Sequence, residues 1–316
     1  MEKFREHVNC RLCGADDYKV MYTWPKNYYD HSKYETASWD GRQEISLRIC
    51  KCNKCGLAYS NPSFKEKYLD LVYPEDIVPS LDNITSEGVF FDLLNFNKYK
   101  DIYEIVKQYI QSRNNATVLD IGTRYGGLPH YFREQNYNSY GLELNERSVE
   151  LANKFGLDYI YQGTISDLRN YLGGLLPNNL DCVIMDDVLE HLVNPFEDIQ
   201  TIASCQDEGD MLVMRQMNWD GIGHKIFGKN WYYLQPAAHM SYFTPKTGKK
   251  LLEKAGYSRV KIFKKNVVSN IIRTFARFGK KLVLGENRWK VNSGKIMYLQ
   301  ERNKMYDDMF TIIGVK

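Results

Sequence analysis

The second half of the chain alternates short apolar runs with amphipathic segments. The apolar runs have the length and the content of branched residues that buried strands require: TVLDI (117–121), SYGLEL (139–144), DYIYQG (158–163), LDCVIMD (180–186) and DMLVMRQ (210–216). Helically spaced segments separate them, such as ERSVELANKFG (146–156). This alternation predicts an α/β domain built on a parallel, doubly wound sheet.

The pattern continues toward the C-terminus with a helix and two more strands. These are predicted over KTGKKLLEKAG (246–256), SRVKIFKK (258–265) and DMFTIIGVK (308–316). Between the last two, residues 266–306 indicate a mostly helical insertion. The whole α/β domain is therefore expected over residues 116–316.

Residues 63–115 indicate a helical connector that packs on this domain. Apolar side chains at near-helical spacing would share one face: Phe91, Leu94, Tyr99, Ile102, Ile105 and Tyr109. Residues 1–62 lack helical period, are rich in Cys, Tyr and polar residues, and end in the turn-like Ser60-Asn61-Pro62. They are interpreted as a separate small module.

Composition fits one large core with a smaller module, since 43% of the 316 residues are hydrophobic. No apolar run reaches eighteen residues, and the N-terminus MEKFREHVNC is polar, unlike a secretory signal. We expect a cytoplasmic protein without a transmembrane segment.

The net charge of +3 hides an asymmetry along the chain. From Lys246 onward there are 18 Lys and Arg against 5 Asp and Glu, which leaves 24 against 34 before it. A basic C-terminal part could attract a phosphorylated or otherwise acidic ligand, or it could simply be a solvated helix face.

Two matched knuckles carry four of the seven cysteines: Cys10-Arg-Leu-Cys13-Gly and Cys52-Asn-Lys-Cys55-Gly. Four thiolates suit a closed tetrahedral Zn²⁺ site, and the following glycines permit the tight turns that aim N–H groups at sulfur. We predict a structural zinc ion on Cys10, Cys13, Cys52 and Cys55; reduced non-ligand cysteines or an iron centre are the alternatives. Cys50 is a spare that could replace Cys52 only with a longer loop between ligands.

The segment Val118–Gly127 is a buried strand that enters a glycine-containing turn and then a helix, where an open α/β sheet binds nucleotides. Glu143 ends the next strand, where its carboxylate can accept hydrogen bonds from both ribose hydroxyls. Dinucleotide dehydrogenases share this arrangement but require a fuller Gly-x-Gly-x-x-Gly, and nothing else in the sequence indicates hydride transfer.

These residues resemble the first motif of class I S-adenosylmethionine-dependent methyltransferases, Asp/Glu-x-Gly-x-Gly-x-Gly. Asp120, Gly122 and Gly126 match it, whereas Arg124 occupies the middle glycine. Positive φ at a non-glycine residue costs about 1 to 2 kcal/mol. Either the turn is re-routed through Gly127, or Arg124 pairs with the methionine carboxylate of the cofactor. The resemblance implies a Rossmann-like, seven-stranded sheet with S-adenosyl-L-methionine as cofactor.

A second stretch, Asp181 to Pro195, is similar to the fourth-strand segment of small-molecule methyltransferases, which ends in Leu-Glu-His and an Asn/Asp-Pro. The resemblance implies that Asp186 leaves the strand beside the sulfonium. It also implies that Thr164 and Ile165, directly after Gly163, cap the adenine; the family commonly has Asp where Thr164 stands.

Methyl transfer needs alignment, exclusion of water and, for a hydroxyl acceptor, a base. The region after the fifth strand supplies aromatic residues and His239, the candidate general base, because imidazole titrates near neutral pH. His239 could instead cap a helix or satisfy a buried carbonyl. His191 competes for the role, and Tyr242 is a further candidate that more often packs or lines a substrate.

Trp-x-x-Leu followed by Pro236 and His-x-x-Tyr-Phe resembles the substrate loop of methyltransferases that act on sugars and other small metabolites. The knuckles also resemble those of C-methyltransferases of nucleotide-linked deoxysugars, which continue into a further C-terminal domain. Because this chain ends soon after its last predicted strand, we expect O-methylation of a sugar, nucleotide-sugar or related metabolite, with a phosphorylated or nucleotide-linked sugar as the candidate partner.

Several alternatives stay open, the first of which is a C-methyltransferase of a nucleotide-linked sugar. An RNA methyltransferase is less favoured, because the fourth-strand segment lacks the Asn/Asp-Pro-Pro-aromatic pattern, so nucleic acid is not the expected partner. A non-catalytic scaffold protein is also conceivable, because Arg124 occupies the middle glycine of the cofactor-binding motif. The basic, amphipathic residues 267–284 could contact a membrane surface, although a lid over the acceptor is preferred.

Overall fold

The computed structural model describes residues 5–24, 46–65, 90, 94, 99–231, 233–236, 238–264 and 309–316. The predicted insertion at 266–306, with its basic segment, lies outside the described residues, as does most of the predicted connector before residue 99. Among the helices of the described ranges, none combines the length and apolar character that a membrane crossing requires.

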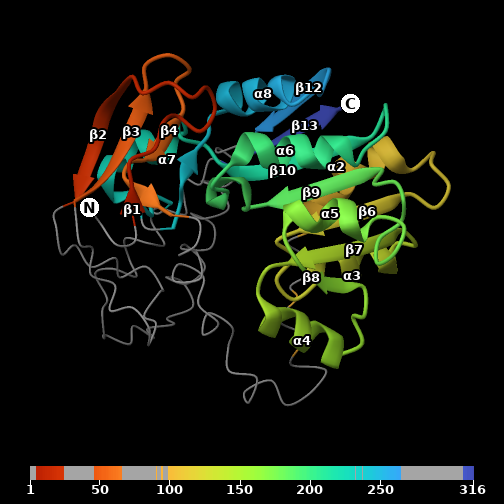
Figure 1. Ribbon diagram of the computed structural model, residues 1–316. Coiled ribbons are helices and arrows are strands. Elements are labelled where there is room, and N and C mark those ends of the chain that lie inside the picture. Colours follow the sequence, from red (N-terminus) through yellow and green to blue (C-terminus); the bar gives the residue numbers. More distant parts are fainter. Residues whose placement is uncertain are drawn as a thin grey trace, which may run out of the picture.

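A seven-stranded sheet forms the centre of the described structure, in the order β12-β13-β10-β9-β6-β7-β8 (Figure 1). Its strands are β6 (Thr117–Ile121), β7 (Asn138–Glu143), β8 (Ile160–Gln162), β9 (Cys182–Asp186), β10 (Met211–Met217), β12 (Arg259–Lys264) and β13 (Met309–Val315). Strands β6 to β10 are parallel, and β13 runs antiparallel between β10 and β12. The predicted α/β architecture is confirmed, with each strand within two residues of its expected limits.

Helices cover both faces of this sheet, because its central strands are apolar on both sides. On one face α2 (Lys100–Ile110) and α3 (Gly127–Glu134) share a buried cluster with β6, β9 and β10. On the other face α5 (Leu168–Tyr171), α6 (Pro195–Ser204) and α8 (Pro245–Lys254) do the same. Helix α4 (Glu146–Lys154) packs against β7 and β8. Cys182 and Cys205 are buried.

The buried face of α2 is rotated from the predicted one. Ile102 is buried as expected, but it shares the face with Tyr103, Val106 and Ile110. Ile105 and Tyr109, which the apolar spacing favoured, are only partly buried at its margin. The spacing allowed both faces, and the position of the sheet selected one of them.

A smaller, four-stranded sheet lies beside the large one, in the order β11-β4-β3-β2 (Figure 1). Its strands are β2 (Tyr18–Trp24), β3 (Leu47–Cys52), β4 (Ala58–Ser60) and β11 (Ser241–Tyr242). Strands β1 (Arg5–Glu6) and β5 (Ser63–Phe64) form a separate pair. Strand β11 thus comes from the second half of the chain, far in sequence from its neighbour β4.

The core of the smaller sheet is shared with the second half of the chain. Trp24, Leu47 and Ile49 pack with Trp219 and Trp231, which follow β10 and flank α7 (Ile222–Phe227). The division at residue 62 remains a prediction; within the described structure, residues on both sides of it bury each other's apolar surface.

Charged side chains close the amino end of the large sheet. Arg113 Nη1 donates to Asp181 Oδ1 and to Asp210 Oδ1, both at 2.5 Å, and Nη2 donates to the Gly209 carbonyl at 2.6 Å. Asp181 also accepts from the Thr117 main chain. Arg113 therefore joins the beginnings of β6, β9 and β10 in one network.

We expect Arg113→Met to lower the free energy of unfolding by about 2 kcal/mol, because it leaves the buried Asp210 carboxylate without its cation. Urea unfolding followed by circular dichroism would measure this. The matched control is Arg169→Met, which removes an exposed arginine with one hydrogen bond, to Ser204. Equal stability of the two variants would contradict the role of Arg113.

Candidate functional site

The loop after β6 is a tight turn with three left-handed residues. Gly122, Arg124 and Gly126 have φ of 72°, 55° and 83°. A Cβ at Gly122 would lie 2.6 Å from Val188 Cγ2, so this glycine allows close approach of the chain that follows β9. Arg124 adopts the strained conformation itself, and the alternative of a turn re-routed through Gly127 is wrong. Gly127 instead begins α3.

Glu143 holds this loop against the end of β7. Its Oε2 accepts from the Arg124 main-chain N–H at 2.7 Å, and its Oε1 accepts from the Asn145 N–H at 2.9 Å. Burial raises the pKa of Glu143, and the two N–H donors oppose that shift. The hydrogen bond from Arg124 offsets part of the cost of its positive φ. The Leu144 N–H also acts to lower the pKa of Glu143.

Asp120 is buried near the carboxyl end of β6, beside Gly141 of β7. Tyr99 reaches the same end of the sheet from the start of α2: a Cβ at Gly127 would lie 2.7 Å from its hydroxyl. Burial raises the pKa of Tyr99, and the charges of Asp120 and Asp186 add to the shift. The loop and these acidic groups therefore lie together at the carboxyl end of the sheet, a place that we call the crevice and where open α/β sheets bind nucleotides.

Thr164 and Ile165 follow β8 on the same side of the sheet. Thr164 is exposed and caps a short helical turn over Ile165–Asp167: its N–H and its hydroxyl both donate to Asp167 Oδ2. Ile165 is buried. Asp167, which sequence reasoning missed, thus brings a carboxylate to Thr164.

Asp186 ends β9 and forms a two-point ion pair with Arg215 of β10, with Nε donating to Oδ1 at 2.6 Å and Nη2 donating to Oδ2. Burial alone would lower the pKa of Arg215, but the hydrogen bonds and charges of Asp186 and Asp187 outweigh it and raise the pKa. The Asp187 N–H donates to the Arg215 carbonyl, and Asp187 has φ of 57°. The chain therefore turns sharply after β9.

Beyond this turn lies a cluster of three side chains: Glu190, His191 and His239. One carboxylate oxygen and one ring nitrogen from each histidine lie within 4.8 Å of one another. Glu190 is 1% exposed, and neither of its carboxylate oxygens has a hydrogen-bond partner. The two imidazole rings are in edge-to-face contact at 4.7 Å between centroids.

Main-chain carbonyls fix the orientation of both imidazoles. His239 Nδ1 donates to the Tyr233 carbonyl at 2.8 Å, and His191 Nδ1 donates to the Ala238 carbonyl at 3.2 Å. Burial lowers the pKa of His191 to about 4, and burial together with the neighbouring His191 lowers that of His239. Both rings are therefore neutral near pH 7, with the proton on Nδ1 and the lone pair on Nε2.

Burial raises the pKa of Glu190 well above its ordinary value, and the negative charges of Asp187 and Asp186 act in the same direction. The raised pKa favours the neutral acid, but a carboxyl group buried without a hydrogen-bond partner is costly in either protonation state. The cluster thus concentrates acceptor atoms in a place from which water is largely excluded.

The smaller sheet positions the loop that carries His239. Met240 N–H donates to the Glu190 carbonyl at 2.7 Å, and the Met240 carbonyl accepts from the Ser60 N–H at 3.0 Å. Ser60 Oγ also donates to the His239 carbonyl at 2.7 Å. The loop is therefore fixed between β4 and the turn after β9.

Tyr242 of β11 is buried, and its ring lies 5.9 Å from that of His239 and 5.4 Å from that of Trp219. The structure places Tyr242 behind the histidine, within the aromatic core of the smaller sheet.

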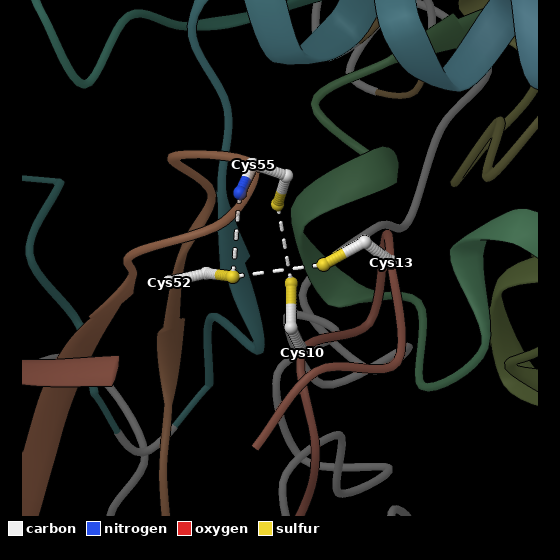
Figure 2. A group of neighbouring side chains, drawn as sticks. All are labelled: Cys10, Cys13, Cys52 and Cys55. Carbon is white, nitrogen blue, oxygen red and sulfur yellow. Dashed lines mark hydrogen bonds between the residues drawn. The ribbon is translucent and has the colours of Figure 1, made fainter. Parts of the chain in front are cut away.

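The four knuckle cysteines converge on one point (Figure 2). The sulfurs of Cys10 and Cys55 are 3.4 Å apart, and those of Cys13 and Cys52 are 3.6 Å apart. Thiolates bound tetrahedrally at about 2.3 Å from one metal ion would be about 3.8 Å apart. All seven cysteines are free thiols.

Main-chain N–H groups approach the sulfurs in the same way in both knuckles. Cys55 N–H donates to the first sulfur of its knuckle, Cys52, as Cys13 N–H does to Cys10. Burial raises the pKa of Cys13, and the Ala15 N–H opposes that shift. The neighbouring Cys10 thiol lowers the pKa of Cys55 to about 5, and the Leu57 N–H acts in the same direction. This repeated arrangement stabilises thiolates, so the cluster can hold a metal ion.

The spare Cys50 is buried and lies outside this group of four. The group itself is anchored on the large sheet's helices: Lys254 of α8 donates to the Leu12 carbonyl at 3.1 Å, and Lys250 donates to the Cys55 carbonyl at 3.4 Å.

Besides the four cysteines and Tyr242, the structure brings the predicted residues to two places. The carboxyl ends of β6 to β9 carry Asp120, Gly122, Arg124, Gly126, Glu143, Thr164, Ile165 and Asp186, and the turn beyond them carries His191 and the nearby His239. Besides Asp167, sequence reasoning missed Arg215, Glu190 and Ser60. Glu190 stands beside the predicted His191, so the adjacency of two ionisable residues was an available signal; Arg215 and Ser60 gave none, because their roles depend on strand neighbours.

A hollow of about 230 Å³ lies at the opposite end of the strands, lined by Arg113, Asp181, Arg259 and Lys261 among others. It touches none of the residues named for the crevice or the cluster.

Comparison with known proteins gives a family and a fold. Residues 96–262, just over half of the chain, match the family described as "Methyltransferase domain". No curated protein sequence matches. Solved structures that are similar include a SAM-dependent methyltransferase from Archaeoglobus fulgidus, with 20% identity, TM-score 0.47, and coverage of 70% of this chain and 95% of that one.

Another similar structure is phosphoethanolamine N-methyltransferase 2 from Haemonchus contortus in complex with S-adenosyl-L-methionine. It is 12% identical, with a TM-score of 0.50 and coverage of 82% of this chain and 62% of that one. At this identity the likeness concerns the fold.

We expect Arg215→Gln to destabilise the protein by about 2 to 3 kcal/mol, because it leaves the buried Asp186 carboxylate without its cation. The double variant Asp186→Asn, Arg215→Gln should recover part of the loss, since no charge then remains unpaired. Chemical denaturation of the four proteins of this cycle would measure the coupling. Additive effects would show that the pair is not energetically coupled.

Proposed function

This chain belongs to the methyltransferase-domain family, and from that premise we propose that it transfers the methyl group of S-adenosyl-L-methionine to a hydroxyl of a small metabolite. The observation that carries the proposal is the contact between Glu143 and the loop after β6. A carboxylate at the end of β7, held beside a glycine turn at the end of β6, is the arrangement that grips an adenosyl ribose in an open α/β sheet.

In this proposal each crevice residue binds one part of the cofactor. The carboxylate of Glu143 accepts from the ribose hydroxyls, and Thr164 and Ile165 border the adenine. Gly122 and Gly126 let the main chain approach, with Asp120 beneath it, and the exposed Arg124 pairs with the methionine carboxylate. Asp186 lies toward the sulfonium, with its charge balanced by Arg215.

The acceptor hydroxyl would lie against the cluster beyond β9. As the acceptor oxygen bonds to the methyl carbon, the carbon–sulfur bond breaks and its electron pair returns to sulfur. The hydroxyl proton needs a base, and His239 is our candidate, because its Nε2 lone pair is available in the neutral ring. His191 is the second candidate, and Tyr242 would support the ring of His239 rather than take the proton.

For the acceptor we propose a sugar, nucleotide-sugar or related metabolite, on the strength of the substrate-loop resemblance and the basic C-terminal part of the sequence. We further propose a cytoplasmic location, which the free thiols support, since a reducing compartment keeps such clusters unoxidised.

For the four knuckle cysteines we propose a structural zinc ion. The sulfur separations and the repeated N–H approach fit four thiolates around one ion. Because all four ligands come from the chain, the ion would have no position for substrate and would stabilise the smaller sheet.

The test of the methyltransferase proposal is Glu143→Ala. We expect S-adenosylhomocysteine to bind this variant about 10- to 100-fold more weakly, because charged hydrogen bonds to the ribose and to the loop are lost. Isothermal titration calorimetry would measure it, with Glu150→Ala on the exposed side of α4 as the control. A dissociation constant that does not change in Glu143→Ala, or no binding by the unaltered protein, would overturn the proposal.

For the zinc site we expect the purified protein to contain about one zinc ion per chain by elemental analysis. Cys13→Ser should lose the metal and lower the melting temperature, because a structural ion contributes directly to folding. The control is Cys50→Ser, which alters a buried thiol outside the group of four and should keep the metal. Zinc retained in Cys13→Ser but lost in Cys50→Ser would mean a different ligand set.

A further inference from the structure

A second group of ligands lies in the acceptor cluster itself. Glu190, His191 and His239 supply a carboxylate oxygen and two imidazole nitrogens within 4.8 Å of one another. Two ligands that are each about 2.1 Å from one ion are about 3 to 4 Å apart, so small side-chain rotations would close the group on an ion.

Main-chain carbonyls set the tautomer of both imidazoles in this group. Each imidazole donates its Nδ1 proton to a main-chain carbonyl, Tyr233 for His239 and Ala238 for His191. Such outward hydrogen bonds orient histidines that bind metal through Nε2. Glu190 adds two further acceptor oxygens, both buried and without a hydrogen-bond partner.

A proton shared between Glu190 and a histidine does not account for this arrangement. Sharing would require an O–H···N contact at about 2.6 to 3.0 Å, whereas Glu190 makes no hydrogen bond to either imidazole. The three groups thus offer ligand atoms within 4.8 Å of one another without a hydrogen bond from Glu190 to either ring. The neighbouring charges of Asp187 and Asp186 would further favour a cation.

We propose that Glu190, His191 and His239 bind a divalent first-row transition-metal ion that holds the acceptor hydroxyl. Two imidazoles and one carboxylate suit Zn²⁺, Mn²⁺, Fe²⁺ or Co²⁺ better than Mg²⁺ or Ca²⁺, which prefer oxygen ligands. An ion with three protein ligands keeps open coordination positions for the acceptor, whereas an ion held by the four cysteines has none. This site is separate from the cysteine group and shares no ligand with it.

The chemistry of this site rests on the proposed function. An acceptor hydroxyl bound to the ion would lose its proton more readily. The proton would pass to water outside the cluster as the oxygen bonds to the methyl carbon and the carbon–sulfur bond breaks, its electron pair returning to sulfur. With the ion bound, His239 serves as a ligand and the ion promotes loss of the proton; His239 is the base only in the protein without this ion. Acceptors with two adjacent hydroxyls, as on sugars, would be favoured, because both oxygens can occupy open positions on one ion.

The experiment measures metal binding without methyl transfer. The full chain is first loaded with zinc to fill the cysteine site, then titrated with Mn²⁺, followed by electron paramagnetic resonance, and with Co²⁺, followed by calorimetry. Hard Mn²⁺ avoids thiolates. We expect about one further ion per chain, bound about 100-fold more weakly or not at all by Glu190→Gln and His239→Gln. Glu197→Gln, on an exposed position of α6, is the matched control and should bind normally.

Folding is checked in the same variants. Glu190→Gln replaces a buried carboxyl group that has no hydrogen-bond partner, so without metal its melting temperature should equal or exceed that of the unaltered protein. Added metal should raise the melting temperature of the unaltered protein but not that of the variant. No further ion of either metal, or equal binding by Glu190→Gln, would overturn the inference. Binding of S-adenosylhomocysteine to the unaltered protein is measured in parallel. A protein that binds the metal ion but not S-adenosylhomocysteine would contradict the proposed function and not the metal site.

Discussion

The main-chain hydrogen bonds at Met240 hold the functional half of the molecule together. Its N–H donates to the Glu190 carbonyl at the end of the large sheet, and its carbonyl accepts from Ser60 in the smaller sheet. Since neither partner can move without breaking a buried hydrogen bond, His239 has one position relative to Glu190 and His191. The smaller sheet is therefore part of the acceptor side of the site, and its stability sets how well that side is formed.

Four acidic residues discussed above lie at or just beyond the carboxyl ends of the strands, and they differ in their hydrogen-bond partners. Glu143 receives two main-chain N–H groups, and Asp186 receives both arms of Arg215. Asp120 is buried in the crevice. Glu190 alone among these four has both carboxylate oxygens without a hydrogen-bond partner. Because a carboxyl group buried without a hydrogen-bond partner is costly in either protonation state, the position of Glu190 points to a ligand, whereas Glu143 and Asp186 are already stabilised by the protein.

A continuous series of contacts through β3 and β4 links the four knuckle cysteines to the cluster of Glu190, His191 and His239. The second knuckle ends β3 and leads into β4, whose Ser60 fixes the loop of His239. Lysines of α8 hold the carbonyls of both knuckles from the side of the large sheet. A metal ion on the cysteines would thus act on the acceptor site through the rigidity of β3 and β4, with no direct part in the reaction.

By itself, the sequence determined the seven strands of the large sheet, the crevice loop with Glu143, and the grouping of the four cysteines. Each of these follows from local spacing: apolar runs set strands, and a residue at the end of a parallel strand lies at the same edge as its neighbours' ends.

Only the tertiary structure decided the buried face of α2, the insertion of β11 beside β4, the pairing of Asp186 with Arg215 and the isolation of Glu190. These features depend on which distant segments become neighbours, and periodicity along the chain carries no information about a partner across the sheet. Arg124 shows the same limit, because its strained conformation is stabilised by a carboxylate nineteen residues away in sequence.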